Sequence, residues 1–366
     1  MECRIGDIYS ERSQRGADDM ELLSVTLNDG VMPRSEIEGK DNSSEDKSNY
    51  KVVCKGDMVY NSMRMWQGAN GVSDYDGIVS PAYTVLMPNK EIDNRYFASL
   101  FKTPNLINEF RKYSQGLTSD TWNLKYPQIR SIRLYIPSLQ EQHKISVFIS
   151  TLEERIGIQR QLVDSLKKYK RGLLSHLFSE KSTQRCTTKR YYFSEIAQRR
   201  SEKYDPSSGI EYPCVELENI EQESGKILAT VPSIKQGSIK NIARPGDTLF
   251  GKLRPYLRKY AFAEQMMVCS SEIWTLIPSD VVLPKFLFYL TQTEQFLQVA
   301  NISSGTKMPR AEWSNIEKAE FFIPDFSVQH KTVSLLERVD KKITYTDSVL
   351  IYLKGLKTGL IQKLFI

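Results

Sequence analysis

Two stretches of the chain carry apolar residues at positions spaced alternately by four and three residues. They fall within residues 136–180 and 323–366. This spacing is the a/d pattern of a coiled-coil seam. A helix of about 40 residues would be about 60 Å long, and its single apolar stripe needs a partner to be buried. The first register runs through Ile145, Ile149, Leu152, Ile156, Gln159, Val163, Leu166, Lys170, Leu173 and Leu177, and the second through Thr332, Leu336, Val339, Ile343, Thr346, Leu350, Leu353, Lys357, Leu360 and Leu364.

The two stretches are copies of one another. The run I-P-S-L-Q-E-Q-H-K that begins at Ile136 returns as I-P-D-F-S-V-Q-H-K at Ile323, an offset of 187 residues (323 − 136). The polar interruptions of the seam coincide at the same offset. A duplication implies approximate two-fold symmetry, so we expect the two helices to pack as an antiparallel pair. Two unrelated amphipathic core helices are the alternative, which the length and strict spacing disfavour.

Each long helix opens on a start signal. Ser138 follows a proline and precedes Glu141 by three residues, which is a capping box. In the second copy Asp325 takes the capping position but Val328 replaces the glutamate, so only half of the box is kept.

The residues before each long helix repeat more weakly, at an offset of 190. K-G-D-M-V-Y from Lys55 aligns with P-G-D-T-L-F from Pro245. Both copies predict short strands broken by turns, then a short helix at 96–101 and at 285–290. At the same offset, Arg64 aligns with Arg254 and Ser80 with Ser270. At an offset of 188, Ile8 aligns with Ile196 and Arg12 with Arg200.

These patterns predict an α+β protein with an internal pseudo-two-fold repeat. Two mixed α/β domains would occupy residues 1–135 and 191–322, and the long helices would occupy 136–180 and 323–366. The polar residues 181–190 would form a surface linker between the first helix and the second domain.

Composition narrows the class of protein. The 366 residues are 40% hydrophobic and 26% charged, which is ordinary for a water-soluble protein of two domains. No apolar run is long enough to span a membrane, and no signal peptide is evident. The net charge of +6 is compatible with a polyanionic partner. Five scattered cysteines without a C-x-x-C pair disfavour disulfides and zinc and suit the reducing cytoplasm.

No catalytic motif stands out. The chain contains no P-loop, no G-x-G-x-x-G and no G-x-S-x-G. His143 and His330 are repeat-equivalent and begin the long helices, where a polar surface role is expected. Glu38 and Lys40 have nuclease-like spacing but lie in a loop-like context. We therefore expect a non-catalytic protein that holds no cofactor and no metal of its own.

The duplicated I-P-x-x-x-x-Q-H-K start of a long helix, with G-L-x-x-x-L-F at its end, resembles the specificity subunit of Type I restriction–modification systems. The pattern Gly56-Asp57, Arg64 and Ser80, with its repeat in the second half, resembles this family as well. The resemblance covers essentially the whole chain. It implies that each mixed domain is a target recognition domain that reads one half of a split, asymmetric DNA sequence. The antiparallel coiled coil would then set the distance between the half-sites.

The resemblance also implies partners. Two modification (methyltransferase) subunits and the restriction subunits would dock on this chain, and S-adenosylmethionine and ATP with Mg would be bound by those partners. The chain begins almost directly at Ile5 with little N-terminal extension, which puts in doubt the contact that closes a circular arrangement in some family members. Residues 209–240 differ strongly from 16–48, as expected for two unrelated half-sites.

A reader of duplex DNA needs cations and hydroxyls for phosphates, and Arg, Lys, Asn or Gln for base edges. Two loops in each domain offer them, and a merely solvated charged face is the alternative. Trp122 and Trp313 follow the second loops and are expected to be packing residues. The candidates are Asn61, Arg64, Gln67, Gln115 and Thr118 in the first domain, and Lys252, Arg254, Arg258, Lys259, Ser304, Thr306, Lys307 and Arg310 in the second.

Two other functional classes remain open. A coiled-coil scaffold that holds two protein-binding domains would show no steep loss of affinity with salt, unlike a DNA reader. A self-contained nuclease or methyltransferase is disfavoured because phosphate-binding and cofactor-binding loops are missing.

Overall fold

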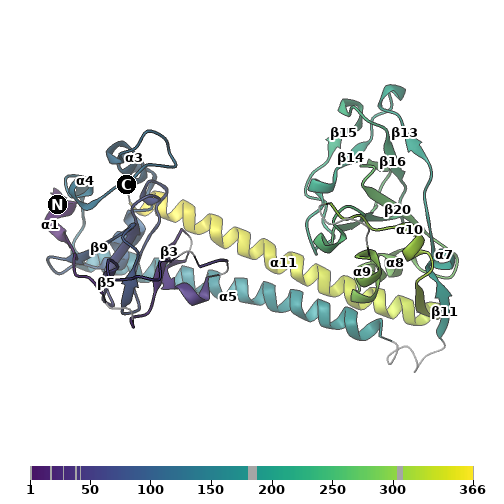
Figure 1. The fold of residues 1–366 in the computed structure, drawn as a ribbon, viewed down its shortest axis with the longest axis horizontal. Coiled ribbons are helices and arrows are strands. Elements are labelled where there is room, and N and C mark those ends of the chain that lie inside the picture. Colours follow the sequence, from purple (N-terminus) through teal and green to yellow (C-terminus); the bar gives the residue numbers. More distant parts are fainter. Residues whose placement is uncertain are drawn as a thin grey trace. The chain divides into compact units, whose positions relative to one another are not determined.

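The computed structural model describes residues 2–16, 19–27, 29–37, 39–41, 43–179, 188–302 and 308–365. It divides into two compact units (Figure 1). Unit 1 comprises residues 1–160 and 348–366, and unit 2 comprises residues 161–347. Two helices of 39 residues each, α5 (Leu139–Leu177) and α11 (Phe326–Leu364), contribute to both units. No helix in the described part of the chain is long and apolar enough to cross a membrane.

Unit 1 is built on a four-stranded antiparallel sheet in the order β2-β9-β6-β7, accompanied by three two-stranded pairs. The strands of the sheet are β2 (Tyr9–Glu11), β9 (Tyr83–Pro88), β6 (Met58–Asn61) and β7 (Asn70–Val72). The pairs are β3 (Leu23–Thr26) with β4 (Gly30–Pro33), β5 (Lys51–Val53) with β8 (Gly77–Val79), and β1 (Glu2–Arg4) with β10 (Arg133–Tyr135). The helical segments are α1 (Ile5–Ile8), η1 (Arg34–Glu36), η2 (Met65–Gln67), α2 (Asn94–Leu100), α3 (Pro104–Tyr113) and α4 (Tyr126–Ile129).

Unit 2 repeats this plan around the sheet β12-β20-β17-β18. That sheet comprises β12 (Ala197–Arg199), β20 (Ile273–Pro278), β17 (Thr248–Gly251) and β18 (Tyr260–Phe262). A five-stranded sheet holds β13 (Lys203–Tyr204), β16 (Lys240–Ala243), β19 (Met267–Cys269), β14 (Pro213–Val215) and β15 (Val231–Pro232), and β11 (Thr188–Tyr192) pairs with β21 (Glu320–Pro324). The helical segments are α7 (Phe193–Ile196), η3 (Pro206–Ser208), η4 (Leu217–Asn219), η5 (Ser233–Lys235), η6 (Pro255–Leu257), α8 (Pro284–Leu290), α9 (Glu294–Ala300) and α10 (Trp313–Ile316).

The weak sequence repeat is therefore a repeat of structure. Strands β6, β7 and β9 have their counterparts in β17, β18 and β20 at the predicted offset of 190, and the central sheets have the same strand order. The predicted short helices correspond to α2 and α8. The α+β fold with an internal repeat is confirmed. The units differ most where the sequences do, because residues 209–240 contribute β14 and β15 to one larger sheet in unit 2.

The predicted seam is the buried face of both long helices. Every a/d position of α5 is buried or half-buried, and so is every one of α11 except Leu364, which is 38% exposed. In unit 2, Lys170 pairs with Asp340 at 2.7 Å, and in unit 1, Lys357 pairs with Glu153 at 2.6 Å. These two pairs are equivalent at the offset of 187. The lysine lies on α5 in one pair and on α11 in the other, and the acid lies on the opposite helix. That exchange is what an antiparallel pair of repeats requires, so the predicted orientation is confirmed.

The long helices begin where their capping residues predict. The Ser138 hydroxyl accepts a hydrogen bond from the Glu141 N–H at 3.3 Å, and an Asp325 carboxylate oxygen accepts one from the Val328 N–H at 3.0 Å. Each side chain thereby satisfies one of the unpaired N–H groups of the first helical turn.

The repeated glutamine of the helix start joins each long helix to its mixed domain. In unit 2 the buried Gln329 accepts a hydrogen bond from the Leu283 N–H at 2.8 Å and donates to the carbonyls of Val281 at 3.0 Å and Pro324 at 2.9 Å. In unit 1 the equivalent Gln142 accepts from the Asp93 N–H at 3.2 Å and donates to the Pro137 carbonyl. Both glutamines therefore hold the segment just before a short helix, α2 or α8.

Replacing Gln329 by alanine is expected to lower the free energy of unfolding by about 2 kcal/mol, because buried main-chain groups lose their partners. Chemical denaturation followed by circular dichroism measures this change. His330→Ala, at the exposed neighbour, is the control and should stay within about 0.5 kcal/mol of the parent. Equal effects of the two substitutions would show that the glutamine is not a structural joint.

Candidate nucleic-acid interface

The two candidate loops of each domain lie against one another. In unit 2 the Arg254 N–H donates to the Pro309 carbonyl at 2.7 Å, and the Ala311 N–H donates to the Lys252 carbonyl at 2.8 Å. In unit 1 the Leu124 N–H donates to the Ser62 carbonyl at 2.8 Å, and the rings of Trp66 and Trp122 meet edge to face, 5.3 Å apart. Each unit thus presents one composite surface made of two loops.

The first loop of unit 2 has an unusual backbone. Arg254 and Arg258 flank the short helix η6 and both adopt left-handed conformations, with φ of 51° and 52°. Such a conformation costs a residue with a β-carbon roughly 1–2 kcal/mol, and strain of this kind gathers at functional sites. Arg254 is exposed, and its guanidinium has no ion-pair partner among the residues that the structure describes. It is therefore available to an external anion.

The other cations of this segment have partners within unit 2. Arg258 pairs with Glu294 at 2.7 Å and with Glu223 at 3.5 Å. Lys259 donates to the Leu217 carbonyl at 2.7 Å. Within the basic run of the sequence, Arg258 is therefore neutralised by two acids and Lys259 is held by a carbonyl.

The remaining two described candidates of unit 2 share a single acidic partner, Glu272. Arg310 pairs with it at 2.9 Å, and the Lys252 amine lies 4.0 Å from it. The hydrogen bond from Arg310 holds the pKa of Glu272 below its ordinary value, so this carboxylate stays charged. Ser304, Thr306 and Lys307 lie outside the described residues, and their contact with DNA stays a prediction.

Unit 1 offers fewer charges and more amides. Arg64 and Gln67 are exposed, whereas Asn61 is half-buried and its side-chain oxygen accepts from the Met63 N–H at 3.0 Å. Gln115 and Thr118 are exposed in the second loop.

A glycine shapes that second loop of unit 1. Gly116 has a φ of 149°, and a β-carbon there would lie 2.6 Å from the Thr121 carbonyl oxygen. The close turn therefore requires glycine, and it places the entirely exposed Leu117 next to the candidate residue Thr118.

Other motif residues hold the fold together. Asp57 of the Gly-Asp turn is buried and pairs with Arg12 at 2.7 Å, and Asp247 pairs with Arg200 at 2.8 Å in the same way. Trp313 packs edge to face against Trp274 with ring centroids 5.7 Å apart, as expected for a packing residue. The repeat of Arg12 and Arg200 in the sequence therefore marks an internal ion pair.

The long helices carry exposed apolar residues that the seam pattern did not predict. Apart from the first residue of each helix (Leu139 and Phe326), each unit contributes three, at positions equivalent by the offset of 187, and each side chain is at least 38% exposed. The set in unit 1 is Phe148, Ile158 and Leu356, and the set in unit 2 is Leu335, Tyr345 and Tyr169. We call these two sets the apolar stripes. Comparing the two repeats at solvent-facing positions would have found them.

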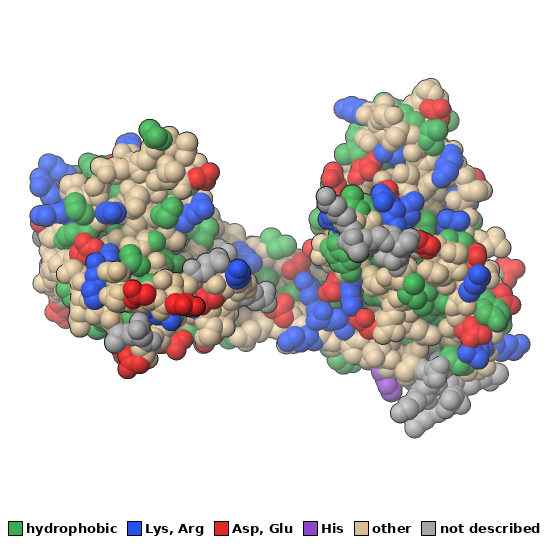
Figure 2. Space-filling view, viewed as in Figure 1, with side chains coloured by type: hydrophobic (Ala, Val, Ile, Leu, Met, Phe, Trp, Pro, Cys, Tyr) green, Lys and Arg blue, Asp and Glu red, His purple; other side chains and the backbone are tan. Residues whose placement is uncertain are grey.

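The surface in Figure 2 shows Lys and Arg side chains interspersed with Asp and Glu on both units. On this face the positive charge does not form one continuous patch. Contact with a polyanion would therefore rest on particular loops rather than on a uniformly basic surface.

Comparison with known proteins gives consistent matches. The model of a family described as Type I restriction modification DNA specificity domain matches residues 4–168 and again 193–352. The Type I restriction enzyme HindI specificity subunit of Haemophilus influenzae is 26% identical over 49% of this chain and 40% of its own length. The MjaVIII specificity subunit of Methanocaldococcus jannaschii is 22% identical over 81% of this chain and 76% of its own length.

Solved structures share the fold at lower identity. A chain from a study of complex assembly and conformational transition of the type I R-M system superposes with a TM-score of 0.61 at 16% identity, covering 100% of this chain and 97% of the other. The S subunit of a Type I restriction-modification system from M. genitalium gives a TM-score of 0.60 at 13% identity, covering 100% and 96%. At these identities the likeness establishes the fold.

Proposed function

The chain belongs to the family of Type I restriction modification DNA specificity domains, and from this premise we propose that it reads a split, asymmetric DNA sequence. Each mixed domain would recognise one half-site. Proteins of this kind recognise DNA and carry no catalytic centre. The observation that supports two half-sites is the composite loop surface, which occurs once in each unit with different side chains.

The two surfaces suit different contacts with DNA. Arg254 in unit 2 combines exposure with the absence of an internal acidic partner in the described structure, which favours a phosphate or a guanine edge. In unit 1, Gln67 and Asn61 are amides of the kind that bind adenine edges, and Arg64 supplies the charge. Thr118 and the second loop would approach the DNA backbone.

We further propose that two modification subunits dock on this chain, one on each apolar stripe. Two equivalent sets of exposed apolar side chains match two copies of one partner, because the same partner surface can use both. Restriction subunits would complete the assembly, which we place in the cytoplasm. S-adenosylmethionine, ATP and Mg would be bound by those partners, and this chain would hold none of them.

The direct test is to co-express the chain with the modification subunit from its own gene neighbourhood and map methylated DNA by single-molecule sequencing. One split motif with an unread gap of fixed length is the expected result. A soluble complex that methylates no DNA, and whose DNA affinity does not fall with salt, would support a protein scaffold instead.

Arg254→Ala is expected to weaken binding to the mapped duplex by about tenfold and to lower the slope of log affinity against log salt by about one. Fluorescence anisotropy at several salt concentrations measures both quantities. Lys189→Ala, at an exposed lysine of strand β11 in the same unit, is the matched control with an equal loss of charge. Unchanged affinity of the Arg254 variant at moderate salt would remove this residue from the interface.

A further inference from the structure

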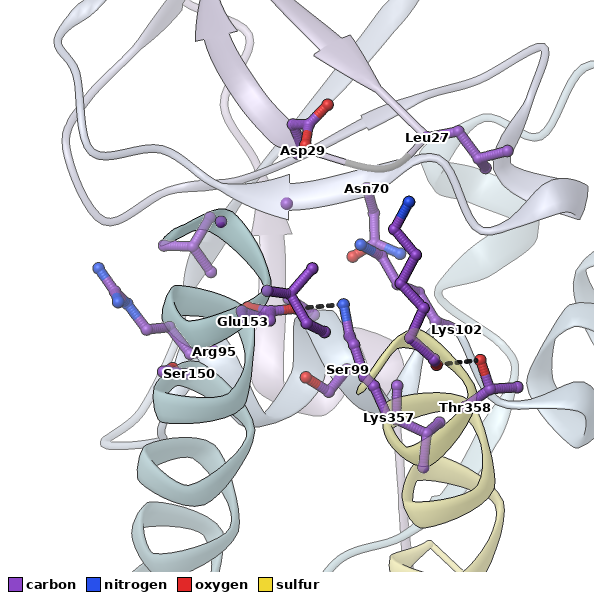
Figure 3. A pocket seen from close by; sticks show the side chains of 18 of the residues that line it. Leu27, Asp29, Asn70, Arg95, Ser99, Lys102, Ser150, Glu153, Lys357 and Thr358 are labelled. Atoms are coloured by element: carbon purple, nitrogen blue, oxygen red, sulfur yellow. Dashed lines mark hydrogen bonds and ion pairs between the residues drawn. The ribbon is translucent and has the colours of Figure 1, made fainter. Parts of the chain in front are cut away.

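A hollow of about 750 Å³ lies within unit 1 (Figure 3). Strands β4 and β7, helix α2 and the segments of both long helices that belong to this unit surround it. Figure 3 shows the long side chain of Lys102, with Asn70 beside it and the paired Lys357 and Glu153 across the opening. The apolar part of the wall includes Val31, Val72, Ala98, Ile156 and Ile361.

The equivalent place in unit 2 is filled with aromatic rings. At the offset of 190, Ala98 and Ser99 of α2 correspond to Phe288 and Tyr289 of α8, while Asn70 and Val72 of β7 correspond to Tyr260 and Phe262 of β18. The ring of Phe288 lies 6.1 Å from that of Tyr260 and 5.8 Å from that of Phe262. The Tyr289 hydroxyl donates to Asp340 at 2.8 Å.

The hollow therefore has a specific origin. Four positions that are aromatic in one repeat carry smaller side chains in the other, on the same backbone plan. The hollow opens to solvent, so a small molecule can enter it.

One polar atom of the wall has no partner. Asn70 is fully buried, and its amide nitrogen donates to the Gly68 carbonyl at 3.1 Å. Its side-chain oxygen accepts no hydrogen bond from any residue in the described part of the chain. An unsatisfied buried acceptor costs roughly 1–3 kcal/mol. Because Asn70 has no exposed surface, this cost belongs to the packing behind the wall of the hollow.

One charge of the wall is also unmatched. Lys102 has no ion pair among the described residues, because Glu153 is engaged by Lys357 at 2.6 Å. Burial, and then the charge of Lys357, lower the pKa of Lys102 from its ordinary value. The equivalent residue in unit 2 is the neutral Gln292. The fold therefore does not require a lysine at this position, and the lysine occurs only in the unit that has the hollow.

We propose that this hollow binds a small phosphate-bearing molecule of about nucleotide size. Lys102 would hold the phosphate, and the apolar wall would cover the organic part. The volume lies within the range of small-molecule pockets, and a DNA duplex is too wide to enter it. The site is separate from the loop surfaces, so the proposal does not rest on DNA reading.

Isothermal titration of the full chain with adenosine 5′-monophosphate tests the proposal, with adenosine and inorganic phosphate as partial probes. We expect one site per chain that binds the nucleotide at least tenfold more tightly than either partial probe. Lys102→Gln introduces the residue found at the equivalent place in unit 2 and should weaken nucleotide binding at least tenfold. Ser99→Tyr introduces the tyrosine of unit 2 and should abolish binding by filling the hollow.

One control keeps these outcomes interpretable. Lys112→Gln, at an exposed lysine of the same unit, should leave nucleotide binding unchanged. Circular dichroism and the thermal midpoint check the folding of each variant, and Lys102→Gln suffices if Ser99→Tyr does not fold. The proposal is wrong if no probe binds at millimolar concentration, if inorganic phosphate binds as tightly as the nucleotide, or if Lys102→Gln weakens only duplex DNA binding.

Discussion

Removing one heptad from the middle of both long helices is expected to shorten the unread gap of the DNA site by about three base pairs. Seven helical residues span about 10 Å, and one base pair spans about 3.4 Å. Deleting 159–165 from α5 and 345–351 from α11 removes matched stretches, because both ion pairs of the seam obey the same register (153 with 357, and 170 with 340). Ile158 is kept, and Tyr352 takes the place of Tyr345, so both apolar stripes are preserved. Each seam keeps its alternating spacing after the deletion. Methylome mapping of the co-expressed complex measures the new gap.

The two half-sites should stay the same in that experiment, because no residue of the composite loop surfaces changes. Deleting the heptad from α5 alone is the control. It shifts the register of one helix against the other, separates Lys170 from Asp340, and should yield unfolded or insoluble protein. A doubly deleted chain that folds and still methylates the original gap would show that the helices do not set the spacing.

Replacing Asp340 by alanine is expected to lower the free energy of unfolding by about 4 kcal/mol. The Lys170 side chain is 7% exposed and would lose its counter-ion, and removing one partner of a buried pair is strongly destabilising. Tyr289 also loses its acceptor. Burial and the charge of Asp340 raise the pKa of Tyr289, so its hydroxyl is protonated and donates to that carboxylate. Denaturant titration measures the loss.

The repeat supplies a matched control for this substitution. Glu153→Ala breaks the equivalent pair in unit 1, where the glutamate and lysine side chains are 47% and 21% exposed. Solvent screens that pair, and the expected loss is about 1 kcal/mol or less. The double variant Lys170→Met with Asp340→Leu should recover much of the stability, because it leaves no isolated charge. Equal losses at Asp340 and Glu153 would refute this account of the seam.

The sequence predicted the seam well because burial in a long helix pair depends on local spacing alone. The prediction that Leu364 is buried was wrong. This residue lies in the last turn of the helix, where the ring of the next residue, Phe365, packs 5.1 Å from that of Tyr96. Here a contact with a residue distant in sequence decides which side chain is buried. Local periodicity carries no information on such a contact.

The candidate site was less predictable for the same reason. Lys252 to Lys259 forms a basic run in the sequence, but Arg258 meets acids from two separate segments, at Glu223 and Glu294. Those pairings depend on the tertiary fold. The internal repeat was the more reliable guide, because aligning the two halves of the sequence singles out Arg254 as the counterpart of Arg64. Both arginines are exposed in the fold.

The two charged pairs of the seam make each repeat self-complementary. Helix α5 carries both an acid, Glu153, and a lysine, Lys170. They pair with Lys357 and Asp340 of helix α11. A polypeptide of one repeat would thus hold every group needed to pair with a second copy of itself. The present chain has the form of such a homodimer joined into one polypeptide. In a single polypeptide the two loop surfaces can differ, because a change in one half need not appear in the other.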